Sequence, residues 1–510
     1  MSRTVRSRRI AFVGIALMLC RLTLAADERS AAKTSLDDGL HKIQHIVVIY
    51  AENRSFDNLY GLFPGANGIA QATPEQYRQK DRDGISTLDT LPPVWPDARH
   101  PSLGPTEHTS GLPNRPFRID APPIDYPLNI PTRDLVHRYY QHIEQINGGR
   151  NDMFVALSDA GALAMGYYDG SLLPMWQYAR QYTLADNFFM GAFGGSFVNH
   201  LYLVCACVAH YPGAPEKLKA AVTQNGRLEM ATDAPKRAMD GPPKWKHDGA
   251  ITPDDYAVNT MEPPYQPSGV PPAKDGDPAY ADTRGDPSHV LPAQSMETIG
   301  DTLSAKNISW AWYGAGWDQA LADSVLDVNA RRVIKWTAAG SINFQTHHQP
   351  FNYFRQFAPG TAARSAHLRD GSDFFSALDA GTLPQVSFYK PAGYLNEHPG
   401  YTDVMSGDAH IAAIIARIQA SSVWSSVAIV VTYDENGGFW DHVAPPKGDR
   451  WGPGTRVPAI IISPYAKKGF VDHTPYDTGS ILKFITRRFD LKPLAGVRSD
   501  AGDLTNAFAF

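Results

Sequence analysis

The stretch VAIVVTYDENGGFWDH, residues 427–442, decides the fold. Its first seven residues are mostly apolar and β-branched, which is typical of a strand buried on both faces of a parallel sheet. The run passes directly into Asp434, Glu435 and Asn436. Open parallel sheets bind ligands beyond the carboxyl ends of their strands, so we expect these polar side chains at the rim of a binding crevice.

Three more short apolar runs, at 46–50, 386–389 and 459–462, predict further strands of the same sheet. We expect all four to be central parallel strands, because helical patterns at 410–419 and 479–489 provide helices to cover the sheet. The predicted class is therefore α/β, with a mostly parallel sheet sandwiched by helices.

Two long segments, roughly 64–131 and 232–288, are rich in Pro, Gly, Asp and Asn and lack helical or strand periodicity. Long loops inside a domain are typically functional excursions. We predict that both are insertions forming a lid over the site, within a single catalytic domain that spans residues 26–510.

Residues 1–25 have the pattern of an export signal: arginines precede an apolar run at 10–20, and small residues follow at Ala25 and Ala26. The alternative is an uncleaved anchor, but the run covers little more than half of the ~20 residues that span a bilayer. We predict a signal peptide over 1–25 and a periplasmic or extracellular protein. The general secretory route is expected, and Arg8-Arg9 leave a twin-arginine route open.

Without that segment the chain carries 42 basic and 52 acidic residues. This acidic balance argues against a nucleic-acid partner or an anionic membrane, both of which attract Lys and Arg. We therefore predict no nucleic-acid partner and no stable membrane anchor, and the oligomeric state stays open. A bond between Cys205 and Cys207, two residues apart, would be strained, so we expect buried free thiols.

The predicted strand nearest the N-terminus also ends in polar residues, Glu52 and Asn53. Because parallel strands end at one edge of the sheet, Glu52, Asp434 and Glu435 can share one cation. Carboxylate oxygens and the Asn53 carbonyl suit Ca, Mg, Mn or similar ions better than a thiolate-bound metal. The alternative is that Asn53 and Asp57 only cap the following helix.

A glycine-rich turn at 191–195 precedes Ser196 and a helical pattern. Glycines let a backbone approach an anion, and a helix N-terminus favours negative charge. Ser196 is therefore a candidate nucleophile, which a neighbouring base or a metal would have to activate. The alternative is a plain glycine turn capped by a serine.

Histidines in loop-like contexts complete the candidates: His137, the pair His347 and His348, and His398. A phosphoryl site uses imidazoles to neutralise equatorial oxygens and to protonate the leaving alkoxide in mildly acid solution. Taken singly, each histidine fits an ordinary surface or core position better than a catalytic one, so the surrounding motifs must supply the argument.

Together these motifs resemble the bacterial phosphoesterase family of secreted acid phosphatases and phosphatidylcholine-type phospholipases C, which has the alkaline-phosphatase-like fold. The similarity runs from Ile43 to about Leu491, with signatures at 45–57 and 432–443. It implies one divalent metal ion (Ca, Mg, Mn, Fe or Zn) held by Glu52, Asn53, Ser196, Asp434 and Glu435. It also implies phosphoryl contacts from His137, Asn199, His398 and one of the pair His347 and His348.

Within that family, the runs 146–149, 194–200 and 347–351 look closer to the acid phosphatases. We therefore expect a phosphatase of small phosphomonoesters that forms a phosphoserine on Ser196, with His398 as the acid for the departing alcohol. The first alternative is a phospholipase C that cleaves phosphatidylcholine-type phosphodiesters. The second is a secreted binding protein that keeps the fold around an inactive site.

Overall fold

The computed structural model describes residues 36–510; the predicted signal peptide lies outside the described residues. The chain divides into two compact units, one comprising residues up to 44 together with Phe510, and one comprising residues 45–509. All elements discussed below belong to the second unit. Between residues 36 and 510, no helix has the length and apolar character needed to cross a bilayer.

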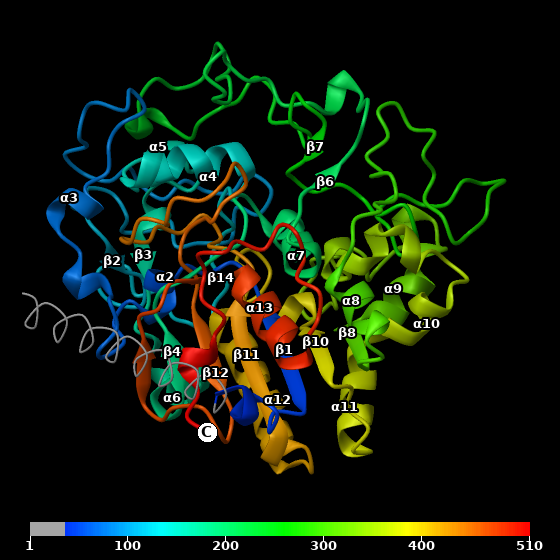
Figure 1. The fold of residues 1–510 in the computed structure, drawn as a ribbon. Helices are drawn as coiled ribbons and strands as arrows, with labels where there is room; N and C mark the ends of the chain where they lie inside the picture. The colour runs from blue at the N-terminus through cyan, green and yellow to red at the C-terminus, as the bar shows by residue number, and fades with distance from the viewer. Residues whose placement is uncertain (1–35) are drawn as a thin grey trace, which may run out of the picture. The chain divides into compact units, whose positions relative to one another are not determined.

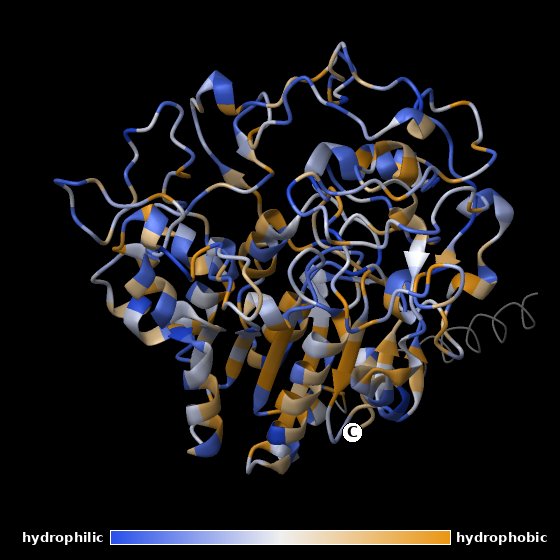
Figure 2. Cartoon of the chain, turned by 180° about the vertical axis from the view of Figure 1, so that it is seen from behind, coloured by the Kyte–Doolittle hydropathy of each residue, from blue (hydrophilic) through white to orange (hydrophobic). Residues whose placement is uncertain are grey.

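An eight-stranded sheet lies at the centre of this unit, in the order β13-β4-β12-β11-β1-β10-β8-β9 (Figure 1). Its middle strands β1 (His45–Ala51), β10 (Val386–Lys390) and β11 (Val427–Tyr433) are almost completely buried. Burial on both faces explains their runs of apolar residues, which Figure 2 shows in orange. The other strands are β4 (Thr183–Ala185), β8 (Trp310–Gly314), β9 (Leu368–Asp370), β12 (Ala459–Ile462) and β13 (Phe470–Asp472).

The strand register places the two polar motifs next to each other. β1 pairs in parallel with β11 from His45 opposite Val427 to Ala51 opposite Tyr433. β1 also pairs in parallel with β10, and β10 with β8. The residues that follow Ala51 and Tyr433 therefore leave the sheet side by side, and the predicted α/β class with a mostly parallel sheet is confirmed.

One strand orientation was predicted wrongly. The run at 459–462 forms β12, which is antiparallel to both β11 and β4. Parallel neighbours need a long crossover, usually a helix, to return the chain to the same edge. Residues 434–458 contain no helix, so the chain turns back at the carboxyl edge and β12 runs the opposite way.

Helices lie against both faces of the sheet, as the two opposite views show (Figures 1 and 2). The helical patterns at 410–419 and 479–489 fall within α12 (Val404–Ala420) and α13 (Thr478–Phe489). α12 packs on α6 (Pro174–Gln181), and α13 packs on α7 (Ser196–Cys205). The remaining α-helices are α2 (Phe56–Tyr60), α3 (Pro74–Tyr77), α4 (Tyr139–Ile146), α5 (Phe154–Leu157), α8 (Ile299–Ala305), α9 (Trp317–Ser324), α10 (Ala362–His367) and α11 (Gly371–Asp379).

The segments 64–131 and 232–288 contain only short elements, among them α3, β2 (Phe117–Arg118) and β7 (Tyr256–Ala257). The first segment is hydrogen-bonded to the second: Arg82 donates to the carbonyl of Pro235, and Asp81 accepts from the backbone N–H of Ala238. The remaining short strands are β3 (Gly166–Tyr167), β5 (Phe188–Phe189), β6 (Ala209–His210) and β14 (Tyr476–Asp477). The domain boundaries given above stay predictions.

Cys205 and Cys207 form a disulfide, which corrects the expectation of free thiols. Ala206 between them adopts a left-handed conformation, with φ of 48°, where α7 ends. The Cα atoms of Cys205 and Cys207 are 5.1 Å apart, within the ordinary range for a disulfide. The spacing in sequence does not reveal this turn, which is why the pairing was missed.

A buried ionic network joins the segments that follow β1 and β11. The Arg456 guanidinium is fully buried and lies 2.8 Å from Asp441 and 3.2 Å from Asp57. His442 Nδ1 lies 2.6 Å from Asp57 Oδ2. Asp57, predicted as a possible helix cap, therefore belongs to this network, which holds the two signature segments together.

Arg456→Met is expected to lower the free energy of unfolding by about 3–5 kcal/mol, because it leaves two buried carboxylates without their countercharge. Urea denaturation measures the loss. The control is Arg369→Met, which removes a largely exposed pair with Asp373 and should cost less than about 1 kcal/mol. Equal losses for the two variants would contradict the role given to Arg456.

Candidate active site

Four of the predicted metal ligands meet beyond β1 and β11. Glu52, Asn53, Asp434 and Glu435 are all buried. The backbone N–H of Asn53 donates to Asp434 Oδ1 at 3.1 Å and so joins the two loops. Gly437 permits this approach, because its φ is +62° and a Cβ there would lie 2.3 Å from the Asn53 carbonyl oxygen.

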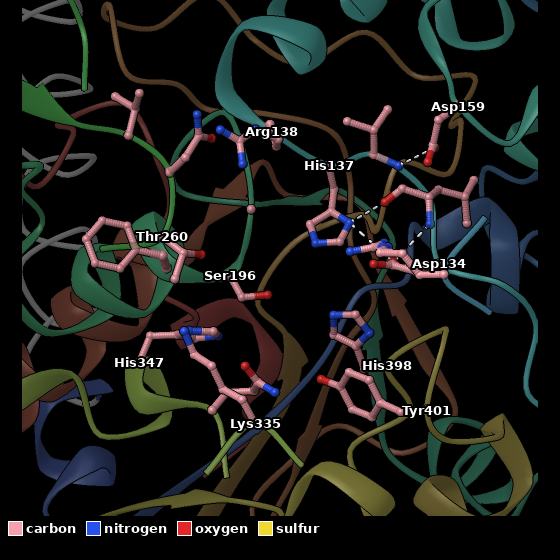
Figure 3. A pocket seen from close by; sticks show the side chains of 18 residues that line it. Asp134, His137, Arg138, Asp159, Ser196, Thr260, Lys335, His347, His398 and Tyr401 are labelled. Carbon is pink, nitrogen blue, oxygen red and sulfur yellow. Dashed lines mark hydrogen bonds and ion pairs between the residues drawn. The ribbon is translucent and has the colours of Figure 1, made fainter. Parts of the chain in front are cut away.

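Ser196 is the first residue of α7 and lies beside these loops. Its hydroxyl donates to Asn53 Oδ1 at 3.3 Å. Figure 3 shows the hydroxyl in the cavity, pointing toward the side on which His137 and His398 lie. The structure thus brings the predicted nucleophile and the predicted metal ligands together from segments far apart in the sequence.

Asn199, one turn further along α7, holds the glycine-rich turn. Its Oδ1 accepts from the N–H of Ala192 at 2.9 Å, and its Nδ2 donates to the carbonyls of Ala192 and Gly195 at 3.1 Å each. The side chain is buried, and Asn199 is not among the residues that line the cavity. This placement points to a positioning role, and the implied phosphoryl contact of Asn199 stays a prediction.

Three of the predicted histidines line the cavity around Ser196: His137, His347 and His398. The rings of His137 and His398 lie 5.6 Å apart, and His398 stacks on Tyr401 at 4.3 Å. Burial opposes protonation of His137, but the carboxylates of Glu435 and Asp134 outweigh it and raise the His137 pKa to about 9. Burial lowers the pKa values of His347 and His398.

The neighbouring residues His347 and His348 lie in different surroundings. His347 faces the cavity (Figure 3). His348 is turned away from the cavity lining, and its Nε2 contacts Glu52 Oε1. Of the two histidines that the sequence left open, the structure therefore brings His347 to the cavity and His348 to Glu52.

Lys390, the last residue of β10, is a site residue that the sequence analysis missed. Its buried Nζ lies 2.7 Å from Glu52 Oε1 and donates to the Tyr50 carbonyl at 3.0 Å. The other carboxylate oxygen, Oε2, accepts from Asn396 at 2.6 Å and from the Tyr401 hydroxyl at 3.1 Å. The signal available in the sequence was a lysine at the end of an apolar run, because residues at the carboxyl end of a strand lie at the sheet edge where the site was expected.

His200 was also missed. It is fully buried, and its Nδ1 lies 2.8 Å from the Ser196 carbonyl oxygen and 3.6 Å from Asp434 Oδ2. The spacing of four residues within one helix was the available signal, since it places His200 one turn below Ser196. Glu52, His200 and Asp434 each offer a ligand atom within 4.8 Å of the others.

The carboxylates fit a divalent cation. Asp434 Oδ2 and Glu435 Oε1 are buried and accept no hydrogen bond from the described residues. Burial raises the pKa of Asp434 to about 7 and that of Glu435 well above its usual range. Buried anionic oxygens of this kind are stabilised by a cation, and oxygen donors suit hard ions such as Ca²⁺ or Mg²⁺.

The cavity beside Ser196 has a volume of about 460 Å³. Both long segments contribute to its lining: Arg99 comes from the first, and Asn259 and Thr260 come from the second. Arg138 and Lys335 line it as well. The long segments therefore reach the site, and side chains that no motif predicted shape its entrance.

Behind His398, two buried carboxyl groups lie close together. Glu397 Oε2 accepts from the Tyr433 hydroxyl at 2.8 Å, and Asp408 Oδ1 accepts from the Met175 N–H at 2.9 Å. Burial raises the pKa of Asp408 to about 7, and burial together with the charge of Asp408 raises the pKa of Glu397 well above its usual range. One or both groups therefore hold a proton in the folded protein.

Between pH 4 and pH 8 the free energy of unfolding of the wild type is expected to fall by about 2–4 kcal/mol relative to that of Asp408→Asn, because the folded protein retains a proton on Asp408 that the unfolded chain releases. Asp408→Asn keeps the acceptor for Met175 and should remove this part of the decline. Urea denaturation at several pH values measures it. Asp403→Asn, which keeps the N-cap of the same helix, is the control and should follow the wild type; a decline unchanged in Asp408→Asn would refute the assignment.

A serine at the head of a helix, beside buried carboxylates and imidazoles at the carboxyl edge of a parallel sheet, defines an α/β protein with a hydrolase-type centre. The chain belongs to the Phosphoesterase family, whose model matches residues 43–492. The family resemblance predicted from Ile43 to about Leu491 is thereby confirmed, and with it the class of phosphoric-ester hydrolases.

The curated relatives are distant but span most of this chain. Phospholipase C B of Mycobacterium tuberculosis is 25% identical, over 92% of this chain and 78% of that protein. Non-hemolytic phospholipase C of Pseudomonas aeruginosa is 24% identical, over 92% of this chain and 58% of that protein. Among solved structures, a protein in the alkaline phosphatase superfamily from Vibrio parahaemolyticus matches 77% of this chain and 76% of its own, with 9% identity and a TM-score of 0.31.

Proposed function

We propose that this protein is a metal-dependent phosphoric-ester hydrolase in which Ser196 attacks phosphorus. The observation that carries the proposal is the meeting, at one sheet edge, of the Ser196 hydroxyl, three cavity-facing histidines and two buried carboxylates, each with one oxygen that accepts no hydrogen bond from the described residues. The residues that would hold the metal are Glu52, Asn53, Ser196, Asp434 and Glu435. A divalent ion there supplies positive charge that favours the serine alkoxide and offsets the charge of the phosphoryl oxygens.

Ser196 Oγ, deprotonated, forms a bond to phosphorus while the bond from phosphorus to the alcohol oxygen breaks, which leaves a phosphoserine. His398 gives a proton to the departing alkoxide, a role worth about 10²–10⁴ in rate. Water then attacks phosphorus, His398 takes a proton from that water, and inorganic phosphate leaves as Ser196 Oγ is released. His137 and His347 face the same cavity; His137, whose pKa is raised, is placed to neutralise a phosphoryl oxygen, and His347 is placed to donate a hydrogen bond to one.

Two substrate classes share this chemistry. The curated relatives are named phospholipase C, which favours phosphatidylcholine-type phosphodiesters over the phosphomonoesters expected from the motifs. The support for phosphomonoesters is that the cavity lining holds three cationic side chains, Arg99, Arg138 and Lys335, against two acids, Asp134 and Asp159, and an excess of positive charge attracts a phosphate dianion and repels a choline cation. We propose phosphomonoesters as the substrate class, with phosphatidylcholine-type diesters as the second candidate.

Turnover of p-nitrophenyl phosphate and of phosphatidylcholine in mixed micelles separates the candidates, with metal content measured on the same samples. The phosphomonoesterase predicts the larger kcat/KM for p-nitrophenyl phosphate. A larger value for phosphatidylcholine would make the protein a phospholipase C. Metal binding without turnover of either ester would refute the proposal of a hydrolase and would favour the alternative of a binding protein.

A further inference from the structure

Tyr401 contacts two parts of the proposed site, the metal ligand Glu52 and the acid His398. Its phenol ring stacks on the His398 imidazole, with the ring centroids 4.3 Å apart and the planes inclined by 18°. Its hydroxyl donates to Glu52 Oε2 at 3.1 Å. Tyr401 and His398 both line the cavity, and in Figure 3 the His398 ring lies between the rings of Tyr401 and His137. The proposed steps at phosphorus do not involve the tyrosine, so its contact with His398 needs a separate explanation.

The backbone around His398 is held by buried side chains. The Asn396 side chain accepts from the His398 N–H at 3.0 Å, and the buried Arg54 guanidinium donates to the Glu397 carbonyl at 2.8 Å. The Thr402 N–H donates to the His398 carbonyl at 3.2 Å. These hydrogen bonds fix the backbone of His398, but they do not by themselves set the side-chain dihedral angles that orient the ring.

Two further contacts orient the His398 ring. Nδ1 contacts the Pro399 carbonyl oxygen, which can only accept, so Nδ1 carries a proton. The Tyr401 ring covers one face of the imidazole and limits its rotation. Nε2 is then the nitrogen left to exchange a proton with the substrate, as the proposed acid requires.

The hydroxyl and the ring of Tyr401 contact different partners, so substitution can separate their effects. Without the hydroxyl, Glu52 still accepts from the Asn396 amide at 2.6 Å and pairs with Lys390 at 2.7 Å. Without the ring, one face of the His398 imidazole loses its cover. Loss of the ring should therefore affect the acid, and loss of the hydroxyl should affect the metal ligand.

We infer that Tyr401 is a positioning residue that holds the His398 ring in the orientation in which Nε2 faces the departing alcohol. This inference rests on the proposed function, in which His398 protonates that alcohol while Ser196 attacks phosphorus. The His398 imidazolium gives its Nε2 proton to the alcohol oxygen as the phosphorus–oxygen bond breaks. It becomes a neutral imidazole that keeps its Nδ1 proton on the Pro399 carbonyl. A turned ring does not make this transfer, and the alcohol then has to leave as its anion.

The test compares p-nitrophenyl phosphate with phenyl phosphate in the metal-loaded wild type and in Tyr401→Leu. p-Nitrophenolate is a stable anion that leaves without a proton, whereas the more basic phenolate depends on the acid. Tyr401→Leu should therefore lower kcat/KM for phenyl phosphate about 10-fold more than for p-nitrophenyl phosphate, because a misplaced acid loses part of its contribution. Tyr401→Met, which also lacks a flat ring, repeats the comparison if Tyr401→Leu lacks the wild-type circular dichroism spectrum.

Tyr401→Phe keeps the ring and removes the hydroxyl. It should weaken metal affinity about 10-fold, because a contact that holds a proposed metal ligand is lost. At saturating metal it should lower kcat/KM for both esters by the same factor. Tyr394→Leu is the matched control, since Tyr394 is an exposed tyrosine close by in sequence and lies outside the cavity lining; it should leave the ratio between the esters unchanged.

His398→Ala is the reference for the acid itself and should show the preferential loss on phenyl phosphate. Adding Tyr401→Leu to it should not enlarge the difference between the esters, because the ring that Tyr401 holds is gone. A further preferential loss in the double variant, or equal losses on the two esters in Tyr401→Leu, would overturn the positioning role while the hydrolase stands. Absence of turnover of both esters in the metal-loaded wild type would instead refute the proposed function.

Discussion

Ser196→Ala is expected to fold and to retain most of its metal, yet to lose about 10³-fold or more in kcat on p-nitrophenyl phosphate. The substitution removes the atom that bonds to phosphorus, and residues that act as one catalytic unit show losses of this size when the nucleophile is deleted. In the structure the hydroxyl donates to Asn53 Oδ1 over a long 3.3 Å, so the free energy of unfolding should change by only about 1 kcal/mol.

Steady-state rates, circular dichroism and metal analysis together check this prediction. Wild-type enzyme quenched in acid during turnover should carry phosphate on the peptide that contains Ser196, and the variant should carry none. Ser376→Ala, an exposed serine on α11, is the control and should match the wild type. An undiminished rate in Ser196→Ala would remove this serine from the mechanism.

Lys390→Met is expected to lower the free energy of unfolding by about 3–5 kcal/mol, because it leaves the buried Glu52 carboxylate without its cation. The variant should also lose turnover, since contacts to Lys390, Asn396 and Tyr401 hold Glu52 at the proposed metal site. Urea denaturation and metal affinity, measured on the same protein, provide readouts besides activity.

A double substitution separates the electrostatic role of Lys390 from simple packing. Combining Lys390→Met with Glu52→Gln removes the unpaired charge, so stability should recover by about 2 kcal/mol or more, whereas activity and metal affinity should stay low. Purely additive losses in the double variant would show that the Lys390–Glu52 pair is not coupled, and would contradict the role given to Lys390.

The names of the relatives and the charges of the cavity lining favour different alcohol groups in the ester, although the proposed reaction at phosphorus is the same. The relatives are named phospholipases C, whereas the cavity lining of this chain includes Arg99, Arg138 and Lys335. Side chains outside the reacting group contribute to the choice of ester, because binding energy away from the reacting atoms affects specificity. The comparison of p-nitrophenyl phosphate with phosphatidylcholine therefore tests what these side chains select.

The candidate site was predictable where it adjoins a strand or a helix start. Glu52 and Asn53 follow one apolar run, Asp434 and Glu435 follow another, and Ser196 opens a helix after a glycine-rich turn. Buried parallel strands have a strong local signal, and their carboxyl ends necessarily lie at one edge. The chemical class of the site could therefore be predicted, because each of these residues stands beside a strand or helix start that is recognisable in the local sequence.

Other features depended on how distant segments pack. The direction of β12 depends on its connection, and the Cys205–Cys207 disulfide depends on a left-handed turn at Ala206. Lys390 became a site residue only because β10 lies beside β1, which brings its Nζ to Glu52. The choice between His347 and His348 likewise followed from which ring faces the cavity.

From its order of residues alone, this chain specifies an α/β sheet with a serine and a set of acidic side chains at one edge, because strand periodicity and strand-end chemistry are local. Only the folded molecule decides which cations hold Glu52, which histidines meet Ser196 and which charged groups from the long segments line the cavity. Those contacts join residues hundreds of positions apart, and their distances depend on packing, which local patterns do not encode.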